Sequence, residues 1–259
     1  MTSKLQSAAK LLRDAYSGDA LPPLRGYLDS DDVAAAYELQ DINTRYWEGQ
    51  GRRIVGRKAG LTAKAVQAQF GVDQPDFGVL FDDMRISDGG QLDPARCIQP
   101  RAEAEIAFVL GADLPSQETI MEDLGGAIAS VHAAIEIVDS RIADWKITFA
   151  DTVADNGSSA FFVLSHDGKS LDGLDLYTAG MVMEVNDRIA SLGAAAAAMD
   201  HPLNSAAWLA RTLALRGEPL RAGDILLTGA LGPIVPLKSG DHVCVRIGGV
   251  GKCSFRYAW

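Results

Sequence analysis

Two apolar segments of this chain carry acidic residues that a protein core does not ordinarily accept. Residues 102–110, AEAEIAFVL, alternate and then become apolar, which predicts a strand that begins at a polar site and enters the core. Residues 131–138, VHAAIEIV, predict a second buried strand that contains Glu136. A fold of this chain must therefore provide a partner for these carboxylates, because an unpaired buried charge is costly.

The spacing of the first two acids places them on the same face of their strand. Glu103 and Glu105 are two residues apart, so their backbone positions lie about 7 Å from each other. An edge strand with both side chains in water is the alternative, and the apolar residues 106–110 weaken it. With Glu136, the three carboxylates offer oxygen ligands to a hard divalent cation such as Mg²⁺ or Mn²⁺. Three of six coordination positions would remain for water or a 2-oxo acid.

The order of predicted elements favours the α+β class. Two amphipathic helices, over residues 2–16 and about 31–48, predict an N-terminal helical cap spanning 1–50. The remainder, 51–259, is rich in strands without regular βαβ alternation, so a mixed or largely antiparallel sheet is expected. Thr62 is expected to cap a short helix, and strands and helices are further predicted over 53–58, 77–81, 118–129 (helix), 159–164, 181–189, 203–215 (helix), 224–228, 242–247 and 253–258.

Composition argues against several classes of partner. The net charge of −10 makes a nucleic-acid backbone a poor partner, and a small anionic substrate would need a local positive centre. No apolar run reaches the length of a membrane span, and the N-terminus lacks the apolar core of a signal peptide. The three cysteines show no metal or disulfide pattern. A cytoplasmic protein is expected.

Other polar residues are weaker candidates for the same site. Lys58 could bind a substrate carboxylate or transfer a proton, and it could equally be an ordinary surface lysine. Asp76 could act as an acid or base, or simply form a turn. The long polar segment 139–157 is expected to be a loop. Asn156, Ser158 and Ser159 lie at its end, where they could orient water or cap the backbone.

Five segments together resemble the 2-keto-4-pentenoate hydratase family, which belongs to the fumarylacetoacetate hydrolase superfamily. They follow the family order over nearly the whole chain, and the N-terminal helical segment matches less distinctively. The segments are GRKAGLTAKAVQAQFGVDQPDFGVLFDDM (56–84), PRAEAEIAFVLGADL (100–114), AAIEIVDSRIADWK (133–146), DTVADNGSSAFFVLS (151–165) and LLTGALGPIVPL (226–237).

The resemblance implies a fold, a cofactor and a set of site residues. The fold is a β-sheet roll of the fumarylacetoacetate hydrolase C-terminal type, which binds Mg²⁺ or Mn²⁺ through Glu103, Glu105 and Glu136. The sequence departs from the family pattern at Ala59 and Ala63, which affects packing rather than the ligands. The catalytic positions that it implies are Lys58, Asp76 and Ser158 or Ser159, and the substrate-binding positions are Leu61, Asn156 and Thr228.

The implied reaction is the hydration of 2-hydroxypenta-2,4-dienoate to 4-hydroxy-2-oxopentanoate in aromatic-compound catabolism. Protonation at C5 and addition of water at C4 require proton transfers, for which Lys58 and Asp76 are the candidates. The resemblance also implies a homo-oligomer that could associate with the next enzyme of the pathway.

Three alternatives remain at this point. The first is 4-oxalocrotonate (2-oxo-3-hexenedioate) decarboxylase, a sister enzyme in which we expect an apolar residue where this chain has Asp76. The second is a hydratase for a longer diacid, whose distal carboxylate would need a cation such as Arg57 or Arg141. The third is a metal-binding structural subunit of a partner enzyme, which the complete set of polar residues disfavours.

Overall fold

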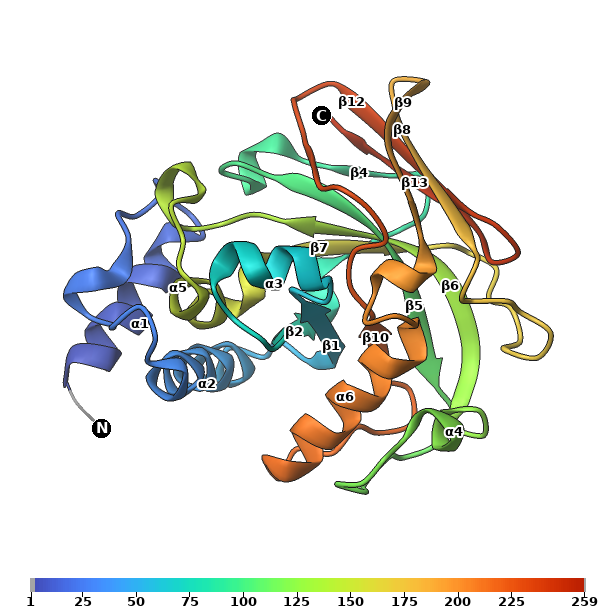
Figure 1. Cartoon of the computed structure of the whole chain (residues 1–259). Coiled ribbons are helices and arrows are strands. Elements are labelled where there is room, and N and C mark those ends of the chain that lie inside the picture. Colours follow the sequence, from blue (N-terminus) through green and yellow to red (C-terminus); the bar gives the residue numbers. More distant parts are fainter. Residues whose placement is uncertain (1–2, 259) are drawn as a thin grey trace.

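The computed structural model describes residues 3–258, which form two β-sheets and a set of helices (Figure 1). The larger sheet has eight strands in the order β2-β1-β10-β5-β6-β7-β3, with β11 beside β5. Only the β1–β10 and β3–β7 pairs in it are parallel. Its strands are β1 (Ile54–Gly60), β2 (Asp76–Phe81), β3 (Arg85–Ile86), β5 (Arg101–Leu110), β6 (Ile128–Val138), β7 (Ser159–Leu164), β10 (Ile225–Leu227) and β11 (Val235–Pro236).

The smaller sheet has five strands and covers one face of the larger one. Its order is β4-β13-β12-β8-β9, and only β4 pairs in parallel with its neighbour. The two sheets therefore confirm the predicted α+β class with mixed, largely antiparallel pairing. The strands are β4 (Gly90–Leu92), β8 (Gly180–Val185), β9 (Arg188–Ala194), β12 (Asp241–Ile247) and β13 (Gly251–Tyr257).

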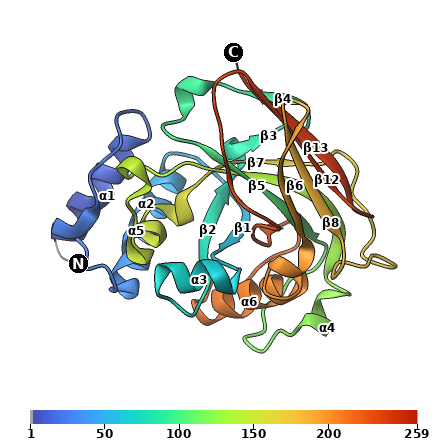
Figure 2. The same cartoon turned by 45° about the horizontal axis from the view of Figure 1, so that its top comes forward.

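The N-terminal helices pack together at one side of the sheets, on the left in Figure 1 and again in Figure 2. α1 (Ser3–Ala15) and α2 (Val33–Gly49) share a hydrophobic core with α5 (Phe149–Ala154). Residue 2, included in the predicted first helix, lies outside the described residues. The division into a 1–50 cap and a 51–259 domain stays a prediction. The remaining helices are α3 (Lys64–Phe70), α4 (Met121–Leu124) and α6 (Pro202–Leu215).

The two faces of the larger sheet bury different groups. Alternate residues of its central strands, such as Ile106 and Ile135, belong to the main core, which also includes side chains of β12, β13 and α6. The other face carries a second apolar cluster that includes Ala107, Phe162 and Leu227. Because side chains alternate along a strand, the register of the sheet decides which residues enter this second, inner face.

Several predicted elements are wrong. The predicted helix 118–129 is helical only over Met121–Leu124, because Gly125 and Gly126 disfavour helix and Ile128 starts β6 opposite Leu110. The predicted strand 181–189 is a hairpin: Asn186 and Asp187 both adopt positive φ, which turns the chain from β8 into β9.

Two further local predictions also need correction. The polar segment 139–157 is not a continuous loop, because it contains α5, whose capping box joins Thr148 and Asp151. Thr62 does not cap α3. The N-cap residue of this helix is Ala63, which has no side chain that could accept a capping hydrogen bond. Among residues 3–258, no helix combines the length and apolar character needed to cross a bilayer.

Replacing a core isoleucine should test the packing of the two sheets. Ile106→Ala removes a side chain that is 0% exposed, and we expect the free energy of unfolding to fall by about 2–5 kcal/mol. Ile189 also lies on a strand but is 64% exposed, so Ile189→Ala should change stability by no more than about 0.5 kcal/mol. Urea denaturation of both variants measures the difference, and equal losses would contradict this assignment of the core.

Candidate active site

The predicted acidic residues meet on the inner face of the larger sheet. Glu103 of β5 pairs directly with Glu136 of β6, and Glu105 follows two residues later on the same face. One carboxylate oxygen from each of the three lies within 4.8 Å of those of the other two. Glu105 and Glu136 are fully buried, whereas Glu103 is partly exposed. Two adjacent antiparallel strands therefore build the acidic cluster without help from a loop.

Sheet register brings Lys58 and Asp76 to the same face. Lys58 of β1 pairs with Leu227, which in turn pairs with Ala107 two residues beyond Glu105. Asp76 pairs with Gly60, two residues after Lys58. Both charged residues are almost completely buried, so the surface-lysine and simple-turn interpretations are wrong.

The lysine supplies the positive charge nearest to the acids. Lys58 Nζ lies 3.6 Å from Oε2 of Glu136. A Cβ added to Gly60 would collide with Oδ1 of Asp76 and lie 3.0 Å from Lys58 Nζ, so glycine leaves the space that both side chains use. One lysine faces four carboxylates here, which leaves the cluster with an excess of negative charge.

This excess changes the protonation of the site. Burial and the Glu136 carboxylate raise the pKa of Glu103 to about 7, and burial with both neighbouring glutamates raises the pKa of Glu105 well above its usual range. Burial likewise raises the pKa of Asp76. For Lys58, burial works to lower the pKa, but the carboxylates of Glu136 and Asp76 outweigh it and the pKa is raised. The lysine is therefore held as an ammonium ion, while the ionised forms of Glu103, Glu105 and Asp76 are disfavoured.

The three glutamates fit a hard divalent cation. Both side-chain oxygens of Glu136 and Oε1 of Glu105 are buried and accept no hydrogen bond from any described residue. The other oxygen of Glu105 accepts a hydrogen bond from the backbone N–H of Gly229 at 2.8 Å, which orients the carboxylate. Buried carboxylate oxygens that accept no hydrogen bond can coordinate a cation. A set of ligands made only of oxygen atoms favours Mg²⁺ or Mn²⁺ over zinc.

Two serines directly follow Gly157, whose backbone packs against the end of the Lys58 side chain. The hydroxyl groups of Ser158 and Ser159 are both buried, and neither has a hydrogen-bond partner among residues 3–258. Such hydroxyls are free to bind an added group, which capping hydroxyls are not.

The three predicted substrate-binding residues differ in whether their side chains already make hydrogen bonds within the protein. Leu61 follows Gly60 with a positive φ of 53° and is partly buried. Thr228 is fully buried and donates its hydroxyl to the carbonyl of Ile106 at 2.8 Å. The side-chain amide of Asn156 bonds the backbone of Val79 through both its oxygen and its nitrogen.

Sequence reasoning missed the backbone and glycine contributions. The N–H of Gly229, the space at Gly60 and the contact of Gly157 with the lysine all shape the candidate site. The glycines in TGALG and in DNGSS were visible signals, because a glycine often marks a close approach of backbone to a neighbour.

A cavity of about 460 Å³ lies elsewhere, beside the N-terminal helices. Its lining includes Tyr16, Trp47, Arg141 and Asn156 but none of the five charged residues of the inner face. The acidic cluster, with its convergent charges, is the stronger candidate for chemistry.

Comparison with known families explains this arrangement. Residues 53–257 match the family model described as fumarylacetoacetate (FAA) hydrolase C-terminal. The chain belongs to the fumarylacetoacetate hydrolase family. This match spans the strands that carry all five charged residues of the inner face.

Relatives within the fumarylacetoacetate hydrolase family narrow the comparison and confirm the predicted resemblance. The chain is 50% identical over 254 residues to 2-keto-4-pentenoate hydratase 1 of Dechloromonas aromatica (strain RCB), covering 98% of this chain and 97% of that protein. It is 42% identical to 2-hydroxyhexa-2,4-dienoate hydratase of Comamonas testosteroni, covering 96% and 95% of the two chains. These relatives are hydratases, as the predicted enzyme class requires.

A solved structure of the same family supports the fold in detail. The 4-oxalocrotonate decarboxylase from Pseudomonas putida G7, complexed with magnesium and adipate, superposes with a TM-score of 0.94. It is 37% identical, and the alignment covers 99% of this chain and 98% of that one. A divalent metal and a dicarboxylate are thus bound by a close structural neighbour of this chain.

Neutralising one ligand should separate metal binding from folding. Glu105→Gln keeps an acceptor for Gly229 N–H but removes a buried charge, so with chelator present its Tm should equal or exceed that of the wild type. Added Mn²⁺ should raise the Tm of the wild type but not that of the variant, because bound ligand stabilises the folded state.

Glu184→Gln is the matched control, since Glu184 lies on β8 and pairs with Arg246 at the surface. It should respond to Mn²⁺ like the wild type. Differential scanning calorimetry with and without chelator measures both effects. An equal rise in Tm for Glu105→Gln would contradict the assignment of Glu105 as a ligand.

Proposed function

We propose that this chain is a metal-dependent hydro-lyase that adds water to 2-hydroxypenta-2,4-dienoate to give 4-hydroxy-2-oxopentanoate in aromatic-compound catabolism. The observation that carries the proposal is the buried acidic cluster with Lys58 and Asp76 beside it, in a chain 50% identical to a 2-keto-4-pentenoate hydratase over 98% of its length. A small 2-oxo or 2-hydroxy-dienoate acid is the substrate class that this site fits.

Glu103, Glu105 and Glu136 would hold Mg²⁺ or Mn²⁺. When bound, the metal supplies a Lewis acid that polarises the oxygens of the substrate. Two of the glutamates are held in place, because Glu105 is oriented by the backbone of Gly229 and Glu136 by the ammonium group of Lys58.

Lys58 and Asp76 are the proposed proton-transfer groups. The lysine is held as an ammonium ion, so it can hydrogen-bond the carboxylate or the C2 oxygen of the substrate. Asp76 has a raised pKa, which suits a group that gives a proton to carbon C5 or takes one from the water that attacks C4. Overall, the substrate gains one H and one OH, so the reaction needs no redox cofactor.

The unpartnered serine hydroxyls are the proposed groups that position water. Ser158 and Ser159 are buried and directly follow Gly157, which packs against Lys58, and either hydroxyl can accept and donate a hydrogen bond. Leu61 and Thr228, which adjoin Gly60 and Gly229, are proposed to contact the carbon chain of the substrate.

Two observations favour the monocarboxylic substrate over a longer diacid. Arg141 is fully buried and bonds Asp155, and Arg57 bonds Glu218, so each of these arginines already has a carboxylate partner. Neither is available to a distal carboxylate without breaking an ion pair.

Asp76 also favours water addition over decarboxylation, although the similar decarboxylase structure keeps loss of CO₂ as the second candidate function.

The broader cellular context belongs to the same proposal. We propose a cytoplasmic homo-oligomer that can associate with the next enzyme of its pathway. Light scattering of the purified chain measures the oligomeric state, and a single-chain mass would contradict that part of the proposal without affecting the chemistry.

The reaction itself gives the first test. Purified protein with Mg²⁺ or Mn²⁺ should remove the ultraviolet absorbance of 2-hydroxypenta-2,4-dienoate, and mass spectrometry should find a product heavier by one water. Chelator should abolish the reaction. Loss of CO₂ from the six-carbon diacid, with no hydration of the dienoate, would assign the chain to the decarboxylase instead.

Asp76→Asn tests the proposed proton-transfer role. General acid–base groups typically contribute 10²–10⁴-fold, so we expect kcat to fall by at least about 100-fold. Asp73→Asn, at an exposed position in the loop that precedes β2, should leave kcat within about twofold of the wild type. Steady-state kinetics on the dienoate compare the two variants. Near-normal turnover by Asp76→Asn would exclude the aspartate from the chemistry.

A further inference from the structure

Three consecutive residues next to the site adopt a left-handed backbone. Asn156, Gly157 and Ser158 have φ values of 57°, 60° and 55°. Non-glycine residues seldom adopt this conformation, and a run of them persists only where surrounding contacts hold it. The contacts that stabilise this turn therefore indicate its structural role.

The turn packs directly against the side chain of Lys58. A Cβ added to Gly157 would lie 2.6 Å from Cε and 3.2 Å from Nζ of Lys58, so the glycine backbone packs against the end of the lysine side chain. The carbonyl of Asn156 likewise occupies the space that a side chain at Gly78 would need. Gly78 is the strand partner of Lys58, so the turn contacts the lysine and its neighbouring strand together.

The side chain of Asn156 joins the turn to strand β2. Its Oδ1 accepts a hydrogen bond from the N–H of Val79 at 2.7 Å, and its Nδ2 donates to the carbonyl of Val79 at 3.0 Å. These two bonds imitate the pairing of one more strand residue. The amide oxygen and nitrogen of Asn156 therefore both bond the backbone rather than a ligand.

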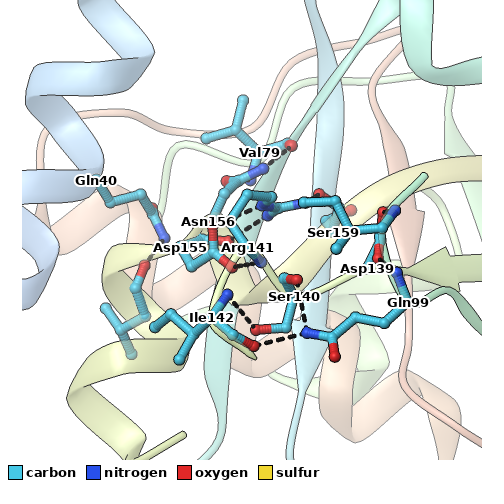
Figure 3. A network of polar contacts seen from close by, with 12 residues as sticks. Gln40, Val79, Gln99, Asp139, Ser140, Arg141, Ile142, Asp155, Asn156 and Ser159 are labelled. Atoms are coloured by element: carbon cyan, nitrogen blue, oxygen red, sulfur yellow. Dashed lines mark hydrogen bonds and ion pairs between the residues drawn. The ribbon is translucent and has the colours of Figure 1, made fainter. Parts of the chain in front are cut away.

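Arg141 holds the turn from its other side, as Figure 3 shows. Its guanidinium donates to the carbonyl of Asp155 at 2.7 Å and to that of Ser159 at 3.3 Å, which are the residues before and after the turn. Its Nε and backbone N–H bond the two carboxylate oxygens of Asp155 at 2.7 and 2.8 Å. One buried ion pair thus fixes both ends of the three-residue turn.

We propose that Asn156 is a positioning residue, which together with the Arg141–Asp155 pair keeps the 156–158 turn against Lys58 so that the ammonium group stays directed at the acidic cluster. This inference rests on the proposed role of Lys58 in hydration. It replaces the predicted contact of Asn156 with substrate by a contact with the strand that carries the site. Misplacing a reacting group by about 1 Å can cost 100-fold in rate.

Asn156→Gly tests this role without straining the backbone. Glycine adopts positive φ freely, so the variant removes the two bonds to Val79 while it tolerates the turn. The matched control is Asn186→Gly: Asn186 has a φ of 53° and bonds Asp241 and His242, but it lies in the exposed β8–β9 turn. Asn156→Asp, which keeps only the acceptor for Val79 N–H, serves if the glycine variant does not fold.

For Asn156→Gly we expect kcat to fall about 10- to 100-fold with KM and the Kd for Mn²⁺ within about threefold of the wild type. Asn186→Gly should keep kcat within about twofold. Unchanged kcat in Asn156→Gly, or a raised KM with normal kcat, overturns the proposal, the latter result assigning Asn156 to substrate binding.

Hydrogen exchange without substrate gives a measurement that is independent of turnover. Amide protection at residues 156–159 should fall in Asn156→Gly and not in Asn186→Gly. Protection equal to that of the wild type overturns the proposed clamp. Absence of dienoate hydration by the wild type would instead refute the proposed function, and the exchange experiment would still decide whether Asn156 holds the turn.

Discussion

The arrangement of the site depends on one constraint: several carboxylates are buried close together on the inner face of the larger sheet. Three glutamates and an aspartate share the inner face with a single lysine, at depths where a carboxylate is expensive to keep ionised. The balance is restored by a cation, by protons or by both. Such an arrangement is typical of a functional site, because apolar residues often stabilise the same strands equally well or better.

The surroundings of the cluster are built to hold charged atoms still. Backbone donors and glycine gaps replace flexible side chains as the nearest neighbours: Gly229 orients Glu105, Gly60 makes room for Asp76 and Gly157 contacts Lys58. Rigid elements carry every proposed ligand, since the glutamates lie on paired strands rather than on loops. Such preorganisation lets the site meet its substrate without first ordering itself.

Strand periodicity explains why much of the site was predictable from the sequence. Glu103 and Glu105 could be placed on one face because side chains alternate, and Glu136 was conspicuous within its apolar run. The pairing of Arg141 with Asp155 was not predictable, because the two residues are fourteen positions apart and the path of the chain through α5 between them decides whether they meet. The hairpin at Asn186 and the short α4 were missed for a different reason: local turn chemistry and glycines overrode an apparently continuous pattern.

The pairing of β5 with β6 has a consequence for how this scaffold tolerates change. Their acidic residues lie near one end of the hairpin, and the connecting segment that follows Leu110 lies at the other. Ladder register, and not the length of that connection, aligns Glu103 with Glu136. The exposed residues 115–118 of that connection are thus a natural place to graft a sequence, such as a reporter peptide. A single deletion inside either strand would instead turn a glutamate to the wrong face and dismantle the site.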